Sequence, residues 1–254
     1  MPSVHNPLAS ASSVYPGRCV LPALALLMIM FEPAAPAQTS DARFYVATYV
    51  DVERSSTNQG IALMAQYLEA SLHTERGNSG MDVIQEIGRP NRFVIMEVWK
   101  DQSSFEAHEQ AEDTARFRAR LKAIHNSPYD QRVHHGLAID PRPPAAGSDI
   151  VFVLTHVDVP PQAKDEAEVL LKRLAEESRK DEGNVRYDVF QQNAPRTNHF
   201  TVFAAWKDRK AFDSYEVKPH TRQFREALGP MLGAPYDERL YMRNPSKAVF
   251  KYGN

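Results

Sequence analysis

The sequence has almost no cysteine. Its single cysteine, Cys19, lies in an N-terminal segment that we interpret below as a leader. A mature chain without cysteine can form no disulfide and offers no thiolate to a metal ion or a substrate. The 254 residues also carry no basic excess, because 30 Lys and Arg stand against 32 Asp and Glu. This balance argues against a general nucleic-acid-binding protein, which would show a basic face or stripe.

The sequence also lacks an apolar run long enough to cross a membrane. The run Val20–Phe31 has only 12 residues, whereas a spanning helix needs about 20. Arg18 precedes this run and Ala35-Pro36-Ala37 follows it, which is the layout of a secretory signal. We expect residues 1–37 to be a signal peptide cut after Ala37, and the protein to be periplasmic or secreted and off the membrane once the leader is removed. A retained anchor helix is the alternative.

Several catalytic motifs are absent as well. There is no H-E-x-x-H zinc motif, no glycine-rich dinucleotide loop and no G-x-S-x-G nucleophile elbow. The adjacent pair His134-His135 would point to opposite faces of a strand and so cannot bind one metal ion together. We therefore predict no metal site and no cofactor.

What the sequence does contain is a long internal repeat. When Phe93–Val133 is set above Phe200–Leu240 without gaps, 14 of the 41 positions are identical, at an offset of 107. Trp-Lys-Asp-x-x-x-Phe and Pro-Tyr-Asp-x-Arg occur in both copies with the same spacing. A period of this length indicates two copies of one domain of about 100 residues.

Each copy predicts the same order of elements. Alternating β-branched and aromatic residues predict first strands, and apolar residues three and four positions apart predict helices after them. Two further strands form a hairpin, a helix broken near its middle follows, and a last strand ends the copy. The segments are 44–52, 81–87, 92–99 and 129–139 for the strands of the first copy, and 151–159, 187–192, 199–206 and 236–242 for those of the second.

The order β-α-β-β-α-β, present twice, is the ferredoxin-like pattern. Two helices would cover one face of each antiparallel sheet, so the other face has to be buried against the second copy. We therefore predict an α+β protein in which two tandem repeats pack sheet to sheet as an intramolecular pseudo-dimer with a barrel-like core. Repeat 1 spans residues 43–139, a Pro-rich linker 140–149, repeat 2 150–243 and a C-terminal tail 244–254. Whether such pseudo-dimers pair again as a homo-oligomer stays open.

Each repeat resembles the antibiotic biosynthesis monooxygenase family of dimeric α+β barrels, which includes small quinol monooxygenases. The residues that carry the resemblance are a strand ending in Trp-Lys-Asp, a Phe, a helical His or Tyr, and a later Phe. They are Trp99-Lys100-Asp101, Phe105, His108 and Phe117 in repeat 1, and Trp206-Lys207-Asp208, Phe212, Tyr215, Pro219-His220 and Phe224 in repeat 2. The resemblance implies a dimeric α+β barrel and, for the activity, cofactor-free oxygenation of aromatic substrates or haem degradation.

Oxygenation without a cofactor needs a dry apolar pocket and a base that removes a proton from an electron-rich phenol. Histidine suits the base because its pKa lies near neutral pH, and aromatic side chains can orient the ring. The candidates for catalysis are His108, His220 and Tyr215, and those for substrate binding are Trp99, Trp206, Phe105, Phe212 and His156. Each residue has a plainer interpretation as part of the core or the surface.

The function predicted from sequence is an exported, cofactor-independent monooxygenase that uses O2 and a quinol or polyphenolic aromatic substrate. One alternative is a barrel that binds a small aromatic ligand without turnover. A further alternative is haem binding or degradation, although the haem-degrading relatives use an Asn, Trp and His set, and neither first strand contains Asn.

Overall fold

The computed structural model describes residues 41–143 and 147–243. The leader predicted over residues 1–37 and the tail at 244–254 lie outside the described residues. Repeat 1 contains β1 (Phe44–Asp51), α1 (Thr57–Thr74), β2 (Asn78–Glu86), β3 (Arg92–Trp99), α2 (Gln102–Glu109), α3 (Glu112–Lys122) and β4 (Asp130–Ala138). Repeat 2 contains β5 (Val151–Asp158), α4 (Lys164–Ser178), β6 (Asn184–Gln192), β7 (His199–Trp206), α5 (Arg209–Glu216), α6 (Pro219–Leu228) and β8 (Asp237–Arg243).

The eight strands form one closed barrel, which confirms the predicted pseudo-dimer. The order around the barrel is β1-β3-β2-β8-β5-β7-β6-β4. Each repeat contributes four consecutive strands, and the two seams, β2 with β8 and β4 with β6, are antiparallel. The last strand of each repeat therefore pairs with its own first strand and with the second strand of the other repeat, which leaves no open sheet edge.

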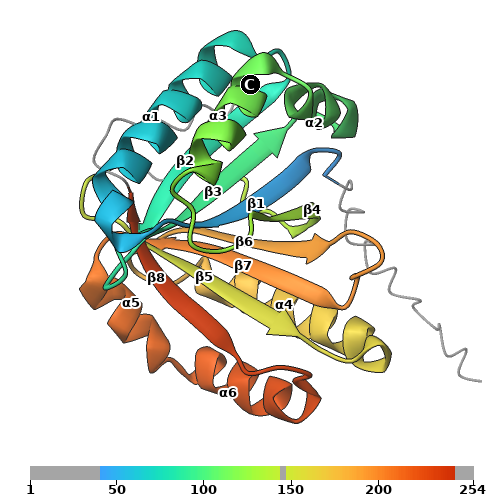
Figure 1. Ribbon diagram of the computed structural model, residues 1–254. Helices are drawn as coiled ribbons and strands as arrows, with labels where there is room; N and C mark the ends of the chain where they lie inside the picture. The colour runs from blue at the N-terminus through green and yellow to red at the C-terminus, as the bar shows by residue number, and fades with distance from the viewer. Residues whose placement is uncertain (1–40, 144–146, 244–254) are drawn as a thin grey trace, which may run out of the picture. The chain divides into compact units, whose positions relative to one another are not determined.

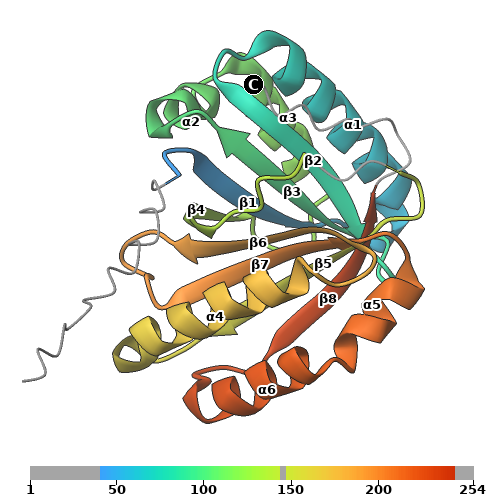
Figure 2. The same ribbon diagram turned by 180° about the vertical axis from the view of Figure 1, so that it is seen from behind.

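Helices cover the outside of the barrel on both halves. Figure 1 shows α1, α2 and α3 over the strands of repeat 1 and α4, α5 and α6 over those of repeat 2, and Figure 2 shows the same arrangement from behind. The strands are therefore buried on both faces. On β1, Tyr45 and Ala47 belong to the apolar cluster inside the barrel, whereas Val50 belongs to the cluster under the helices. This is why strand 44–52 shows no clear polar face in the sequence.

The break predicted in the second helical segment is confirmed in both copies. In repeat 1, α2 ends at Glu109 and α3 starts at Glu112; in repeat 2, α6 starts at Pro219, a position that tolerates proline because the first helical N–H has no acceptor. Asp101 and Asp208 cap α2 and α5 by accepting hydrogen bonds from the backbone N–H groups of Ser104 and Ala211.

Gly77 and Gly183 follow the first helices of the two repeats, which end at Thr74 and Ser178. Both glycines have positive φ, 91° and 84°, but they lie just before the second strands. Their carbonyls accept hydrogen bonds from the backbone N–H groups of Lys100 and Lys207 at 2.8 and 2.9 Å. The two glycines therefore fix the hairpin against the strand that precedes α2 or α5.

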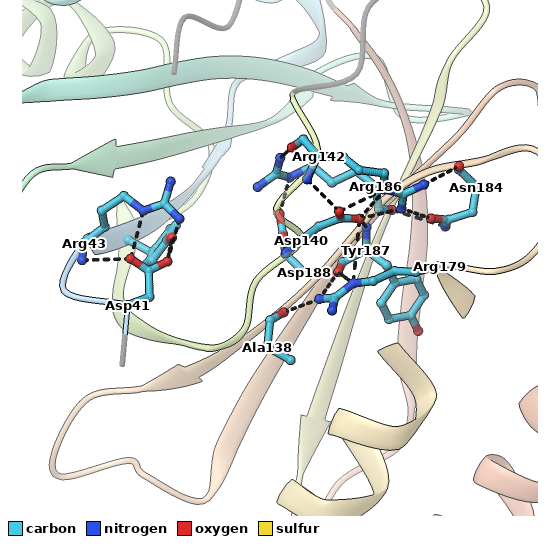
Figure 3. A network of polar contacts seen from close by, with 11 residues as sticks. Asp41, Arg43, Ala138, Asp140, Arg142, Arg179, Asn184, Arg186, Tyr187 and Asp188 are labelled. Atoms are coloured by element: carbon cyan, nitrogen blue, oxygen red, sulfur yellow. Dashed lines mark hydrogen bonds and ion pairs between the residues drawn. The ribbon is translucent and has the colours of Figure 1, made fainter. Parts of the chain in front are cut away.

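A buried polar network fixes the chain where repeat 1 passes into repeat 2 (Figure 3). The Asp140 carboxylate accepts hydrogen bonds from the Arg142 guanidinium and from the backbone N–H of Tyr187 on β6. Burial acts to raise the pKa of Asp140, but the hydrogen bonds from Arg142 hold it below its usual value. The side chain of Arg179, which caps the C-terminus of α4, donates to the carbonyls of Ala138 and Tyr187 at 2.8 Å. The start of the linker is therefore part of the fold of repeat 2.

We expect Asp140→Ala to lower the free energy of unfolding by about 3 kcal/mol, because it leaves buried donors around a removed charge. Asp140 is only 3% exposed. Asp149→Ala is the matched control, since Asp149 is an exposed aspartate of the same linker and should change stability by less than about 0.5 kcal/mol. Urea unfolding of both variants measures this, and equal losses would contradict the role of the network.

In residues 41–143 and 147–243, no helix is both long enough and apolar enough to pass through a membrane.

Candidate functional site

The space between the helices and the sheet of repeat 1 contains a buried polar cluster. The helix-facing side of β3 contributes Glu97 and Trp99, α2 contributes His108, and α1 contributes Tyr67. All four side chains are at most 3% exposed. Polar groups are rarely buried this deeply without partners, so their contacts define what the cluster can do.

His108 is held through both ring nitrogens. Nδ1 lies 2.5 Å from Glu75 Oε2, and Nε2 lies 2.6 Å from the Tyr67 hydroxyl. The carboxylate accepts the Nδ1 proton, which leaves Nε2 as the acceptor of the Tyr67 O–H. The Trp99 ring packs against the imidazole with 4.6 Å between centroids. A histidine oriented by a carboxylate in this way can take up a proton and keep the resulting imidazolium stable.

Glu97 is the second ionisable group of the cluster. Its Oε2 accepts a hydrogen bond of 3.0 Å from Trp99 Nε1 and lies 4.0 Å from His108 Nε2. Burial raises the pKa of Glu97 to about 7, against the lowering effect of His108. Its other oxygen, Oε1, has no hydrogen-bond partner among the described residues. Glu97 is thus a buried carboxylate that can exchange a proton near neutral pH.

A pocket of about 500 Å³ opens in the same repeat, and its lining includes Glu109, the residue after His108 on α2. It is lined from the sheet by Val50, Tyr129 and Gln131 and from the helices by Glu109, Arg118 and Leu121, among others. Burial and then the charge of Glu97 raise the pKa of the Tyr129 hydroxyl to about 12. Tyr129 thus lines the pocket and is within electrostatic reach of Glu97. The volume and the mixed lining suit an aromatic ring that carries hydroxyl groups.

Repeat 2 has a different set of residues at the equivalent places. At the offset of 107, Glu97 corresponds to Ala204, His108 to Tyr215 and Tyr67 to Leu174. The Tyr215 hydroxyl lies 3.0 Å from that of Tyr187, and burial raises the pKa of Tyr215 to about 12. Within the part of the chain that the structure describes, Trp206 Nε1 finds no acceptor, because the glutamate of repeat 1 is missing here.

His220 lies at the edge of the interior of repeat 2. Its Nε2 is 3.0 Å from Asp181 Oδ2, but the ring N–H is not aligned for a hydrogen bond. Its side chain is 21% exposed, and its ring lies 6.0 Å from that of Tyr215. The two predicted histidines therefore lie in different repeats, each beside a carboxylate from the end of the first helix.

The profile of the family described as antibiotic biosynthesis monooxygenase matches residues 43–120 and again residues 150–227. The chain belongs to the antibiotic biosynthesis monooxygenase family. The tryptophan and the helical His or Tyr that predicted this membership from sequence lie together in both repeats, at a ring distance of 4.6 Å.

Individual relatives in curated collections match over about the length of one repeat. YcnE of Bacillus subtilis, described as a candidate monooxygenase, is 32% identical over 88 residues, which are 35% of this chain and 92% of that protein. An isomerase of (4S)-4-hydroxy-5-phosphonooxypentane-2,3-dione from Klebsiella pneumoniae is 27% identical over 35% of this chain and 90% of its own length. The chain spans 63% of the length of an uncharacterised Synechocystis protein, sll1783, at 28% identity over 37% of this chain.

Among solved structures, a candidate monooxygenase from Fusobacterium nucleatum has the same fold. It superimposes with a TM-score of 0.73 at 14% identity, over 83% of this chain and 94% of its own. At this identity the likeness concerns the fold alone. The match over both repeats agrees with the barrel described above for this member of the antibiotic biosynthesis monooxygenase family.

The structure brings most of the predicted residues of this family member together within each repeat. In repeat 1, Phe105 and Trp99 lie beside His108; in repeat 2, Phe212 and Trp206 lie beside Tyr215. His156 is separate, because it lies inside the barrel, 5.2 Å from the Tyr49 ring and 3.4 Å from Thr201 Oγ1.

Sequence reasoning missed Glu97, Tyr67 and Glu75. Glu97 did leave a signal: Phe93, Ile95 and Trp99 share one face of the strand, and a carboxylate among three apolar residues at a period of two is unusual. Glu75 follows the end of α1 and left none. In residues 41–143 and 147–243 no group of three or more His, Cys, Asp or Glu is arranged to hold a metal ion.

His134 and His156 inside the barrel give this family member an acid-sensitive core. Burial, with a smaller effect of neighbouring charges that include Arg132, lowers the pKa of His134 to about 3 and that of His156 to about 4. His134 Nε2 lies 3.1 Å from Thr201 Oγ1. Unfolded histidine has a pKa of about 6.5, so the folded state takes up fewer protons than the unfolded state. The contribution of these two histidines to the free energy of unfolding is therefore fully present above about pH 6.5, and it is lost as the pH falls towards 4 and then 3.

We expect this loss to be about 2 kcal/mol per histidine between pH 6.5 and pH 5. His134→Gln should remove the part of this pH-dependent loss that His134 causes. His135→Gln should leave the loss unchanged, because His135 is exposed on the other face of β4. Urea unfolding at the two pH values measures the slope. An unchanged slope in His134→Gln would contradict this origin of the acid sensitivity.

Proposed function

We propose that this chain is a monooxygenase that inserts one atom of O2 into a phenolic or quinol ring, without a metal ion or an organic cofactor, in repeat 1. The observation that carries the proposal is His108, a buried histidine held between Glu75 and Tyr67 and packed on Trp99. The pocket of about 500 Å³ in the same repeat supplies room for an aromatic ring. Family membership supports the reaction type, and the buried cluster supports repeat 1 as its place.

The reaction needs little chemistry from the protein. A hydroquinone and O2 yield a hydroxyquinone and one water, so that the ring supplies all the electrons and the atoms balance. The protein has to hold the ring away from water and to take up the phenolic proton, because the anion is the form that reduces O2. The proton ends on the His108–Glu75 pair, whose carboxylate stabilises the imidazolium.

The test is oxygen consumption by the purified protein with a panel of hydroquinones and anthrone-like phenols. Uptake that persists in EDTA supports the proposal. A protein that consumes no O2 with any compound of the panel would overturn it.

One observation favours a second candidate, a barrel that binds an aromatic ligand without turnover. Both ring nitrogens of His108 are already occupied, by Tyr67 and by Glu75. Such a protein would bind hydroquinones, measured by quenching of tryptophan fluorescence, and would consume no O2. The same occupied nitrogens fit poorly with haem ligation by His108, and the lack of a Soret band on titration with haemin would dismiss that function.

We also propose that the protein is exported, on the strength of the leader pattern in residues 1–37. Mass spectrometry of the protein from its native host would then find Gln38 as the first residue. Recovery of the whole chain from the cytoplasm would overturn this part of the proposal.

A further inference from the structure

Several buried oxygen atoms in repeat 1 have no hydrogen-bond partner among the described residues, and three of them belong to residues at neighbouring positions on the helix-facing side of the sheet. They are Thr48 Oγ1, Glu97 Oε1 and the Tyr129 hydroxyl. Thr48 and Glu97 are completely buried. Each unpaired buried polar atom costs about 1–3 kcal/mol unless a water or a ligand pairs with it. Three such atoms in one place therefore need a common explanation.

The strand register brings these three atoms to one face of the sheet. On β1, Val46 pairs with Glu97 and Thr48 pairs with Ile95, so Glu97 is the diagonal neighbour of Thr48 on the side facing the helices. On the other side of β1, Thr48 pairs with Gln131 of β4, and Tyr129 lies two residues before Gln131. Thr48 thus lies between Glu97 and Tyr129 on the sheet. Tyr129 and Gln131 also line the pocket of about 500 Å³.

In repeat 2 a carboxylate of the protein itself occupies the equivalent position. At the offset of 107, Thr48 corresponds to Thr155, Tyr129 to Tyr236 and Gln131 to Glu238. Glu238 accepts hydrogen bonds from Thr155 Oγ1 at 3.2 Å and from the Tyr236 hydroxyl at 3.4 Å. Arg225 also donates to Glu238, at 3.2 Å. The carboxylate of repeat 2 therefore pairs with the two hydroxyl groups whose counterparts in repeat 1 have no carboxylate as a hydrogen-bond partner.

In repeat 1 the corresponding Gln131 turns away. Its amide donates to Glu109 Oε1 at 3.3 Å. The neighbouring carboxylate on β3 is that of Glu97, whose Oε2 is held by Trp99 and whose Oε1 has no hydrogen-bond partner among the described residues.

We propose that Thr48, Glu97 and Tyr129 bind the ionisable hydroxyl of a phenolic substrate in repeat 1, and that Glu238 fills the equivalent site of repeat 2 and makes it inactive. The substrate O–H donates its proton to Glu97 Oε1, which leaves a phenolate held by the hydroxyl groups of Thr48 and Tyr129. The neutral carboxyl then passes the proton to His108 Nε2, 4.0 Å from Oε2, once the carboxyl has turned its O–H towards the ring and the Tyr67 hydroxyl has released that nitrogen. Glu97 and Tyr129 are thus catalytic residues, and His108 accepts the proton through Glu97. The identity of the ligand rests on the proposed function, whereas the site can be tested by binding alone.

The experiment is anaerobic binding of hydroquinone and of 1,4-dimethoxybenzene, followed by tryptophan fluorescence and by calorimetry. The second compound has the same ring without O–H groups. We expect the wild-type protein to bind hydroquinone at least tenfold more tightly than the ether. Thr48→Val, Tyr129→Phe and Glu97→Gln should each reduce this ratio by about five- to tenfold, because each removes one partner of the substrate hydroxyl.

The two repeats provide matched controls. Thr155→Val and Tyr236→Phe remove the same hydroxyl groups in repeat 2 and should leave the ratio unchanged. Gln131→Glu copies the arrangement of repeat 2 into repeat 1, and should abolish the preference for hydroquinone while leaving the thermal unfolding temperature equal or higher.

Each outcome decides the proposal. No preference for hydroquinone in the wild type, no loss in the variants of repeat 1, or an equal loss in those of repeat 2 would overturn it. Preferential binding without any oxygen uptake would leave this site in place and would instead refute the monooxygenase function. Oxygen uptake that is unchanged in Glu97→Gln would refute this site and leave the monooxygenase function in place.

Discussion

His108→Gln is expected to lower the turnover of O2 with a hydroquinone by about a thousandfold. Glutamine has a similar length and can hydrogen-bond with Tyr67 and Glu75, so the cluster should keep its packing. It cannot take up a proton, however, and the phenolic proton would then have no buried acceptor beyond Glu97. Initial rates of oxygen consumption at saturating substrate, recorded with an oxygen electrode, measure the change in kcat.

The matched control for this prediction is His220→Gln in repeat 2. His220 lies beside Asp181 and is partly exposed, and its repeat has alanine where repeat 1 has Glu97. We expect this variant to keep its turnover within about twofold of the wild type, as surface substitutions away from the reacting groups do. A large loss in His220→Gln together with normal turnover in His108→Gln would move the working site to repeat 2.

Gly183→Ala is expected to lower the free energy of unfolding by about 4 kcal/mol. The residue has φ of 84°, and a Cβ atom there would lie 2.6 Å from Cβ of Ala211 on α5. The left-handed backbone costs an alanine about 1–2 kcal/mol, and overpacking adds about 1–3 kcal/mol. Ala211 is 6% exposed and its Cβ is attached directly to the backbone of α5, so the clash cannot be relieved by rotating a side chain.

Gly88→Ala separates the two contributions. Its φ is 86°, close to that of Gly183, but a Cβ atom there would meet nothing within 4 Å in the described part of the chain. This variant should therefore lose only the backbone share of about 1–2 kcal/mol. Chemical unfolding of both proteins tests the difference, and equal losses would mean that the contact with α5 is not what makes Gly183 necessary.

The fold was predictable because its signals are local and occur twice. The repeated Trp-Lys-Asp at the end of a strand, and Pro219 at the start of a helix, mark the same positions in the structure as in the sequence. The closure into one barrel followed from the need to bury the second face of each sheet. The seams between β2 and β8 and between β4 and β6 were not predictable, because they depend on pairing across the two repeats.

The candidate site was predictable only in part. Trp99 and His108 were found through their spacing, and they do lie together. Whether a buried oxygen is paired depends on the strand beside it, and only the register shows that Thr155 pairs with Glu238. The difference between the two repeats therefore lies in Ala204 and Glu238, which look unremarkable in the sequence.

This comparison also explains why the copies can differ without loss of the fold. Repeat 2 lacks the buried carboxylate of β3 and has one on β8, whose pKa is raised by burial and by the neighbouring Glu216. Arg225 pairs with both Glu216 and Glu238. The Glu97 and Glu238 carboxylates are thus compensated in different ways, and of these two Glu97 keeps an oxygen atom without a hydrogen-bond partner among the described residues.

The most direct test of the central claim is mass spectrometry of the product formed under ¹⁸O2. The account predicts that the product of a hydroquinone gains one ¹⁸O atom, that the other atom appears in water, and that Glu97→Gln and His108→Gln suppress the labelled product. A product without label, formed together with hydrogen peroxide, or labelling that depends on repeat 2 and not on repeat 1, would contradict it.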